Sequence, residues 1–242
     1  MSPLRVSRLL CLLVIIAGLV ISCSSAPKPS VEPLRPTYLD AVKPLQVSKA
    51  GLPEATLERF YARGWVQNTD TYLNVCTVSQ INKKEQYWIT AAHCVVDIGE
   101  EGRFVDGLKV GLVDVQKEMD LAVIRVPGLI AKEELRLTGT PASWNTPIII
   151  VGHPFGYPDP FVTRGYVANP LATLSSGYRF MIFDVAGAPG NSGSPVLNRD
   201  GELVSILQIG WGQSFSPVTG GAYFENLKTL EQYFTKRVFG MG

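Results

Sequence analysis

Residues 89–94 read Ile89-Thr90-Ala91-Ala92-His93-Cys94, an apolar run that leads through small residues into a histidine and a cysteine. The chain has only one other histidine, His153, so few side chains could act as a base near neutral pH. Such a base activates a serine hydroxyl for acyl transfer when a carboxylate orients it and backbone donors bind the oxyanion. His93 is therefore the candidate base. We expect His153 to be structural, with a role on the substrate side as the alternative.

A candidate nucleophile lies in Gly190-Asn191-Ser192-Gly193-Ser194-Pro195. A nucleophilic serine between glycines suits a tight turn whose backbone N–H groups point at the substrate. Taken alone, this string is also compatible with a surface turn of small polar residues. The candidate acid is Asp120, which begins Asp120-Leu121-Ala122-Val123-Ile124, and its rival is Asp114, which also follows a strand-like run.

These motifs together resemble the trypsin-like serine protease family. Residues 90–94 match that family's signature around its catalytic base, and residues 190–195 differ in two letters from its usual Gly-Asp-Ser-Gly-Gly-Pro. The form with Asn191 and Ser194 resembles the glutamyl-endopeptidase branch, while Asn191 and the strand start at Asp120 resemble the HtrA branch. The order His, Asp, Ser along the chain is also that of the family.

The resemblance implies a catalytic triad of His93, Asp120 and Ser192, with an oxyanion hole formed by the N–H groups of Gly190 and Ser192. It also implies a disulfide between Cys76 and Cys94, which fits an exported chain. No metal or cofactor is implied. Because Asn191 replaces the Asp that pairs with a new N-terminal amine in zymogens, we expect no cleavage-triggered activation.

The fold class expected from the sequence is all-β. Short runs rich in β-branched and aromatic residues recur from about residue 55, separated by turn residues, which predicts a barrel or sandwich. The strands are expected at 72–81, 86–90, 108–116, 121–126, 146–151, 161–168, 178–184, 195–198 and 203–209. Apolar spacing over 225–238 predicts a C-terminal α-helix. The resemblance implies two six-stranded antiparallel β-barrels that meet at the active-site cleft.

A specificity pocket can be outlined by aligning the chain with the family on Ser192. This alignment implies that Ala186 forms the pocket floor, that Gln208 and Gly210 belong to the pocket-side strand, and that Gly221 lines the opposite wall. Since Ala186 offers no acid to a Lys or Arg, we expect a small or medium apolar residue before the scissile bond.

The N-terminus carries the features of an export signal. Arg5 and Arg8 precede an apolar run over 9–21 that is too short to span a bilayer comfortably. Residues 20–23, Val-Ile-Ser-Cys, resemble a bacterial lipobox, which implies a signal peptide over 1–22 and a lipid on Cys23. Residues 23–54 are rich in proline and are expected to be a tether, followed by the protease domain over 55–242.

The sequence thus predicts a serine endopeptidase that acts on polypeptides and is held on a bacterial membrane by a lipid anchor. In a Gram-negative host this would be the outer membrane, facing the periplasm. A formal net charge of +1 and the absence of a basic patch argue against nucleic acid as a partner. The alternative is a membrane-tethered, protease-like binding protein without turnover.

Overall fold

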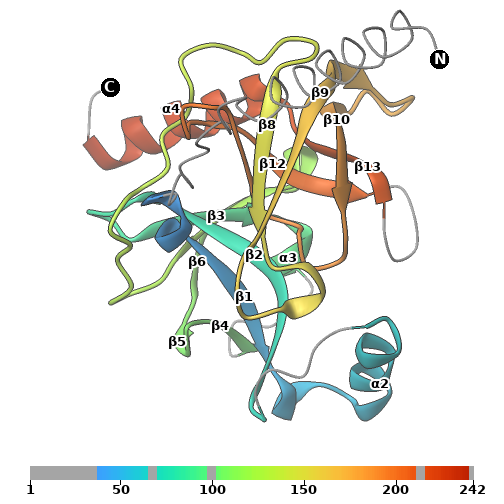
Figure 1. Cartoon of the computed structure of the whole chain (residues 1–242). Coiled ribbons are helices and arrows are strands. Elements are labelled where there is room, and N and C mark those ends of the chain that lie inside the picture. The colour runs from blue at the N-terminus through green and yellow to red at the C-terminus, as the bar shows by residue number, and fades with distance from the viewer. Residues whose placement is uncertain (1–36, 65–69, 97–101, 211–215, 240–242) are drawn as a thin grey trace, which may run out of the picture. The chain divides into compact units, whose positions relative to one another are not determined.

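The structure is a computed structural model that describes residues 37–64, 70–96, 102–210 and 216–239 (Figure 1). Its first sheet holds seven antiparallel strands in the order β5-β4-β1-β2-β3-β7-β6. In chain order they are β1 (Val42–Ser48), β2 (Tyr72–Asn82), β3 (Tyr87–Ala91), β4 (Arg103–Val105), β5 (Leu108–Lys109), β6 (Gly111–Gln116) and β7 (Leu121–Arg125). Large side chains such as Leu45, Trp88 and Ile124 are fully buried here.

The second sheet is a closed barrel of six strands in the order β10-β13-β12-β11-β8-β9. Its strands are β8 (Pro147–Gly152), β9 (Phe161–Thr173), β10 (Arg179–Gly187), β11 (Pro195–Leu197), β12 (Leu203–Gly210) and β13 (Ser216–Ala222). Ile150, Met181 and Phe183 fill its interior. Closure pairs every strand on both sides, so the barrel presents no open edge to other chains.

The helices lie between and after the strands. They are α2 (Glu54–Ala62), α3 (His93–Val96) and α4 (Phe224–Phe239), with 3-10 turns η1 (Thr37–Ala41), η2 (Lys49–Gly51), η4 (Lys117–Met119) and η5 (Pro154–Gly156). On α4, Leu227, Leu230 and Phe234 recur at helical spacing and are buried. They belong to the same apolar cluster as Trp88 of β3, and the rings of Tyr87 and Phe234 lie 5.7 Å apart. Thus α4 follows the second barrel in sequence but helps to complete the core of the first sheet.

The fold class expected from the sequence is confirmed, with differences in the first sheet. This sheet has seven strands instead of six, and the run expected over 108–116 divides at Val110 into β5 and β6. The division arises because β5 pairs with β4 whereas β6 pairs with β7, so the chain changes partner at Val110. The strands β4 and β13 and the helices α2 and α3 were not expected from the sequence.

The prediction of a tether without regular structure over 23–54 is wrong for the second half of that range. Residues 42–48 form β1, which pairs with β2 along its whole length and buries Leu45 and Val47. Pro44 breaks the usual strand pattern, but β4 pairs with β1 only at Gln46 and Val47. Near Pro44 the strand therefore has a single neighbour, as edge strands do, and the missing N–H donor is tolerated there.

The N-terminal predictions lie outside the described residues. These are the signal peptide over 1–22, the lipidated Cys23 and the first part of the tether. Within the described ranges, no helix is both long enough and apolar enough to cross a bilayer.

Candidate active site

His93 and Asp120 meet because the strands that carry them are neighbours. β3 ends two residues before His93, β7 begins just after Asp120, and the two strands pair with Ala91 opposite Leu121. Asp120 Oδ1 accepts a hydrogen bond of 2.9 Å from the backbone N–H of His93, and Oδ2 lies 2.9 Å from His93 Nδ1. The carboxylate of Asp114, the rival acid, instead accepts a hydrogen bond from Gln116.

This contact sets the tautomer of the His93 ring. A carboxylate only accepts hydrogen bonds, so Nδ1 carries the proton and donates a hydrogen bond to Asp120. Nε2 is then the unprotonated nitrogen of the neutral ring, which is the form a general base requires. The His93 side chain is 47% exposed and that of Asp120 is 23% exposed. The ring is thus open to solvent, while its carboxylate partner is more sheltered.

The turn that carries Ser192 is held between both sheets. Thr77 of β2 donates its N–H to the Ser192 carbonyl at 2.8 Å, and the N–H of Gly193 donates to the Leu207 carbonyl of β12 at 2.7 Å. Gly193 has a φ of +84°, and a Cβ there would lie 2.1 Å from the Thr77 carbonyl oxygen. Only glycine fits this position, because both the conformation and the space exclude a side chain.

The backbone before Ser192 rests on the η5 turn. The N–H of Phe155 donates to the Pro189 carbonyl at 2.6 Å. Thr77 Oγ1 donates to the Gly190 carbonyl at 3.0 Å and accepts from the N–H of His153 at 3.1 Å. Among the described residues, the N–H groups of Gly190 and Ser192 donate to no other group, so both remain available to a ligand.

His153 is buried, with 2% of its surface exposed. Its Nδ1 lies 2.9 Å from the Tyr157 carbonyl oxygen, to which it donates a hydrogen bond. Burial lowers the pKa of His153, because removal from water disfavours the charged ring. These contacts suit the structural role expected for His153.

The residues expected at a specificity pocket are placed in different surroundings. Ala186 is half-buried where the pairing of β10 with β13 is irregular, and Gly210 is the last residue of β12. A Cβ on Gly221 would meet Ser205 and Ile206, so this glycine allows β13 to pack closely within the barrel.

Gln208 lies on β12, the strand expected at the side of the pocket. Its side chain is 5% exposed and donates hydrogen bonds to the carbonyls of Met119 and Asp120. The side chain of Gln208 therefore contacts the backbone at the strand start that carries Asp120.

A metal centre finds no support in the described residues. The only group there with suitable spacing is Cys76, His93 and Cys94, whose ligand atoms lie within 4.8 Å of one another. Cys76 and Cys94 are joined by a disulfide, so neither sulfur is a free thiolate that could bind an ion.

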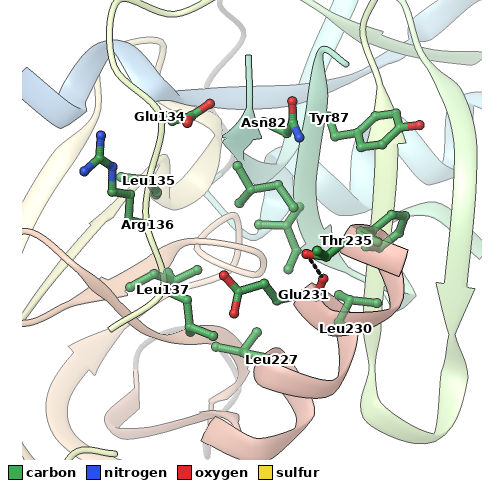
Figure 2. Close-up of a pocket in the computed structure, with 14 residues that line it drawn as sticks. Asn82, Tyr87, Glu134, Leu135, Arg136, Leu137, Leu227, Leu230, Glu231 and Thr235 are labelled. Atoms are coloured by element: carbon green, nitrogen blue, oxygen red, sulfur yellow. Dashed lines mark hydrogen bonds between the residues drawn. The ribbon is translucent and has the colours of Figure 1, made fainter. Parts of the chain in front are cut away.

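An apolar hollow of about 400 Å³ lies elsewhere on the molecule (Figure 2). Figure 2 shows Leu227, Leu230 and Glu231 of α4 lining it together with Leu137. None of His93, Asp120 and Ser192 contributes to its lining, so it is separate from the candidate active site. Burial there raises the pKa of Glu231.

Comparison with known proteins identifies the family. The model of the trypsin-like peptidase domain matches residues 75–206, more than half of the chain. The chain belongs to the trypsin-like peptidase family. The matched range contains His93, Asp120 and Ser192.

Curated relatives of this trypsin-like chain include proteins of Pseudomonas putida strains W619 and GB-1, each named probable periplasmic serine endoprotease DegP-like. Each is 33% identical over 138 residues, which is 52% of the present chain. The present chain spans only 27% of the length of these relatives.

Among solved structures, the fold is similar to that of Rv3671c from Mycobacterium tuberculosis H37Rv, crystallised as an inactive Ser343Ala mutant. The TM-score is 0.59 and the identity 14%, with 85% of this chain and 94% of that chain covered. At 14% sequence identity, the structural similarity to Rv3671c supports the trypsin-like fold alone.

Proposed function

We propose that the protein is a serine endopeptidase that hydrolyses peptide bonds through an acyl-enzyme. The observation that carries the proposal is the double contact of Asp120 with His93, at its backbone N–H and at Nδ1. This contact favours the tautomer of His93 that a general base needs. The chain also belongs to the trypsin-like peptidase family.

In the proposed reaction, Ser192 Oγ attacks the carbonyl carbon of the scissile bond while His93 Nε2 takes its proton. The tetrahedral intermediate collapses, the C–N bond breaks, and His93 Nε2 returns the proton to the leaving amine. Water then attacks the acyl-enzyme while His93 Nε2 takes its proton. The ester C–O bond breaks, His93 Nε2 returns the proton to Ser192 Oγ, and the acid product leaves. Asp120 stabilises the imidazolium that forms in each half of the reaction.

The oxyanion of each intermediate would be bound by the N–H groups of Gly190 and Ser192. The availability of these two donors supports this assignment, as does the support that Thr77 and Phe155 give to the loop. A single donor of this kind contributes about 10²- to 10³-fold to kcat in related chemistry. The buried, uncharged Asn191 supports a domain that folds directly into this form without a zymogen cut.

The finer parts of the proposal concern substrate and location. An apolar residue before the scissile bond is supported by Ala186, which brings no charge to the expected pocket floor. Export and a lipid anchor on Cys23 are supported by the lipobox-like residues 20–23 and by relatives named as periplasmic. Metabolic labelling with palmitate should mark the wild type, and a Cys23→Ala variant should lose the label.

The first test is labelling of the purified, oxidised protein with a fluorophosphonate probe. We expect the wild type to be labelled, Ser192→Ala and His93→Ala to lose the label, and Ser175→Ala, an exposed serine in a turn, to keep it. A peptide library would then determine the preferred residue before the cleaved bond. A folded wild type that takes no label and cleaves no peptide would contradict the proposal and favour a tethered binding protein.

A further inference from the structure

Asp120 has a backbone conformation that residues other than glycine rarely adopt. Its φ of 45° and ψ of 44° lie in the left-handed region, where the Cβ is crowded by the backbone. A residue in such a conformation persists only when its surroundings fix it. Since Asp120 carries the carboxylate that contacts His93, whatever fixes this conformation also fixes the aim of that carboxylate.

Two residues from the second barrel bind the backbone on either side of this strained position. Gln208 Nε2 donates to the Met119 carbonyl at 2.6 Å and to the Asp120 carbonyl at 2.9 Å. Tyr178, which directly precedes β10, donates its hydroxyl proton to Gln208 Oε1 at 2.8 Å and lies 3.4 Å from the Met119 carbonyl. The Asp120 carbonyl also accepts the N–H of Ala92.

From these contacts we propose that Gln208 and Tyr178 act as positioning residues, which hold Asp120 in line with His93 during catalysis. The inference rests on the proposed function and deepens it. Neither residue touches a reacting atom: both act through the backbone of Met119 and Asp120. The arrangement joins the barrel that carries Ser192 to the acid of the other sheet.

The donors and acceptors of Gln208 and Tyr178 allow only one arrangement of these hydrogen bonds. A carbonyl needs a donor, so the amide nitrogen of Gln208 must face Met119 and Asp120, which leaves Oε1 for the tyrosine hydroxyl. Tyr178 can donate to Oε1 only while it is protonated. Burial, with a smaller contribution from the charge of Asp120, raises the pKa of Tyr178 to about 12. The hydrogen-bonded chain is therefore complete throughout the pH range in which a histidine base works.

The test compares Tyr178→Phe and Gln208→Met with the double variant, because each change removes hydrogen bonds and keeps the size of the side chain. We expect a loss of kcat of about 10- to 100-fold for Gln208→Met, as for other small misplacements of a catalytic group, with KM almost unchanged. If the two residues act as a unit, the double variant should be no worse than Gln208→Met alone. The acid limb of the pH profile of kcat/KM should move to lower pH, because a carboxylate held less closely stabilises the imidazolium less.

The matched control is Gln80→Met. Gln80 is also buried, and its amide also bonds two backbone groups, the Leu129 carbonyl and the Ala131 N–H. We expect Gln80→Met to lower the melting temperature and to leave kcat and the pH profile unchanged. Tyr166→Phe, at an exposed tyrosine of β9, controls for loss of a hydroxyl.

The outcomes separate this inference from the proposed function. A labelled, active wild type whose Gln208→Met and Tyr178→Phe variants match Gln80→Met in kcat and pH profile overturns the positioning role alone. An unlabelled, inactive wild type overturns the proposed function, and the positioning role falls with it. Tyr178→Phe removes a single oxygen, so it provides the decisive comparison if Gln208→Met fails to fold.

Discussion

The hydroxyl of Thr77 joins the Gly190 carbonyl to the N–H of His153, with hydrogen bonds of 3.0 and 3.1 Å. One buried side chain on β2 thus connects the loop before Ser192 to the η5 turn that supports it. The backbone of the same residue donates to the Ser192 carbonyl.

Replacing Thr77 by Val should therefore affect both stability and catalysis. The variant leaves the N–H of His153 and the Gly190 carbonyl without this partner, which should lower the free energy of unfolding by about 1–3 kcal/mol. We also expect kcat to fall more than KM rises, because the oxyanion loop is less firmly held. Urea unfolding and peptide kinetics measure the two effects. Thr219→Val, which loses only a 3.5 Å contact with the Val185 carbonyl, should keep normal kcat.

Substitution of Asp120 and of Asp114 should show which of the two carboxylates assists His93. Asp120→Asn keeps the shape but disturbs the tautomer of His93, and in the serine protease triad such a change lowers kcat about 10⁴-fold. Asp114 contacts Gln116 instead, so Asp114→Asn should retain nearly full activity. Equal losses in the two variants would refute the assignment of Asp120.

Gly193 and Gly177 allow backbone strain to be separated from steric exclusion. Both have a φ of +84°, but a Cβ on Gly177 has no neighbour within 4 Å, whereas on Gly193 it would overlap Thr77 and Thr90. Gly177→Ala should cost about 1–3 kcal/mol from the conformation alone. Gly193→Ala should cost clearly more and should abolish fluorophosphonate labelling. Similar unfolding curves for the two variants would show that the crowding around Gly193 is relieved by small shifts.

The buried His153 should make stability depend on pH. Its pKa is lowered in the folded state, so below its ordinary value of about 6.5 the unfolded chain binds more protons than the native one. Stability should be fully present above pH 6.5 and decline as the pH falls toward the native pKa. Between pH 7.5 and 5.5 this residue can account for at most about 1.4 kcal/mol. In His153→Asn, urea unfolding at the two pH values should show a smaller decline than in the wild type.

Reducing the Cys76–Cys94 disulfide should destabilise the loop that carries His93. The two cysteines are 18 residues apart, and closing a loop of this length stabilises by about 3 kcal/mol in the chain-entropy picture. A Cys76→Ser/Cys94→Ser variant should unfold at correspondingly lower urea concentration and become insensitive to reductant. If reductant still lowered the stability of this double variant, the loss seen in the reduced wild type could not be assigned to the Cys76–Cys94 disulfide.

The features that could be predicted from the sequence are those marked by a contiguous motif or by a regular alternation of apolar residues. The motifs around His93 and Ser192 are contiguous, and strands such as β2 and β3 alternate clearly enough to be located from the sequence. β1 was missed because Pro44 breaks its pattern and only its pairing with β2 makes it a strand. The partners of the Gln208 side chain, Met119 and Asp120, could not be predicted because they are far away in sequence. No local pattern marks such a long-range contact.

The position of α4 has a consequence for the order of events during synthesis. Leu227, Leu230 and Phe234 belong to the core around β3, yet they follow all the described strands along the chain. A chain that stops before residue 224 leaves Tyr87 and Ile89 without the helix that covers them. The core around β3 can therefore be completed only after residues 224–234 have been made.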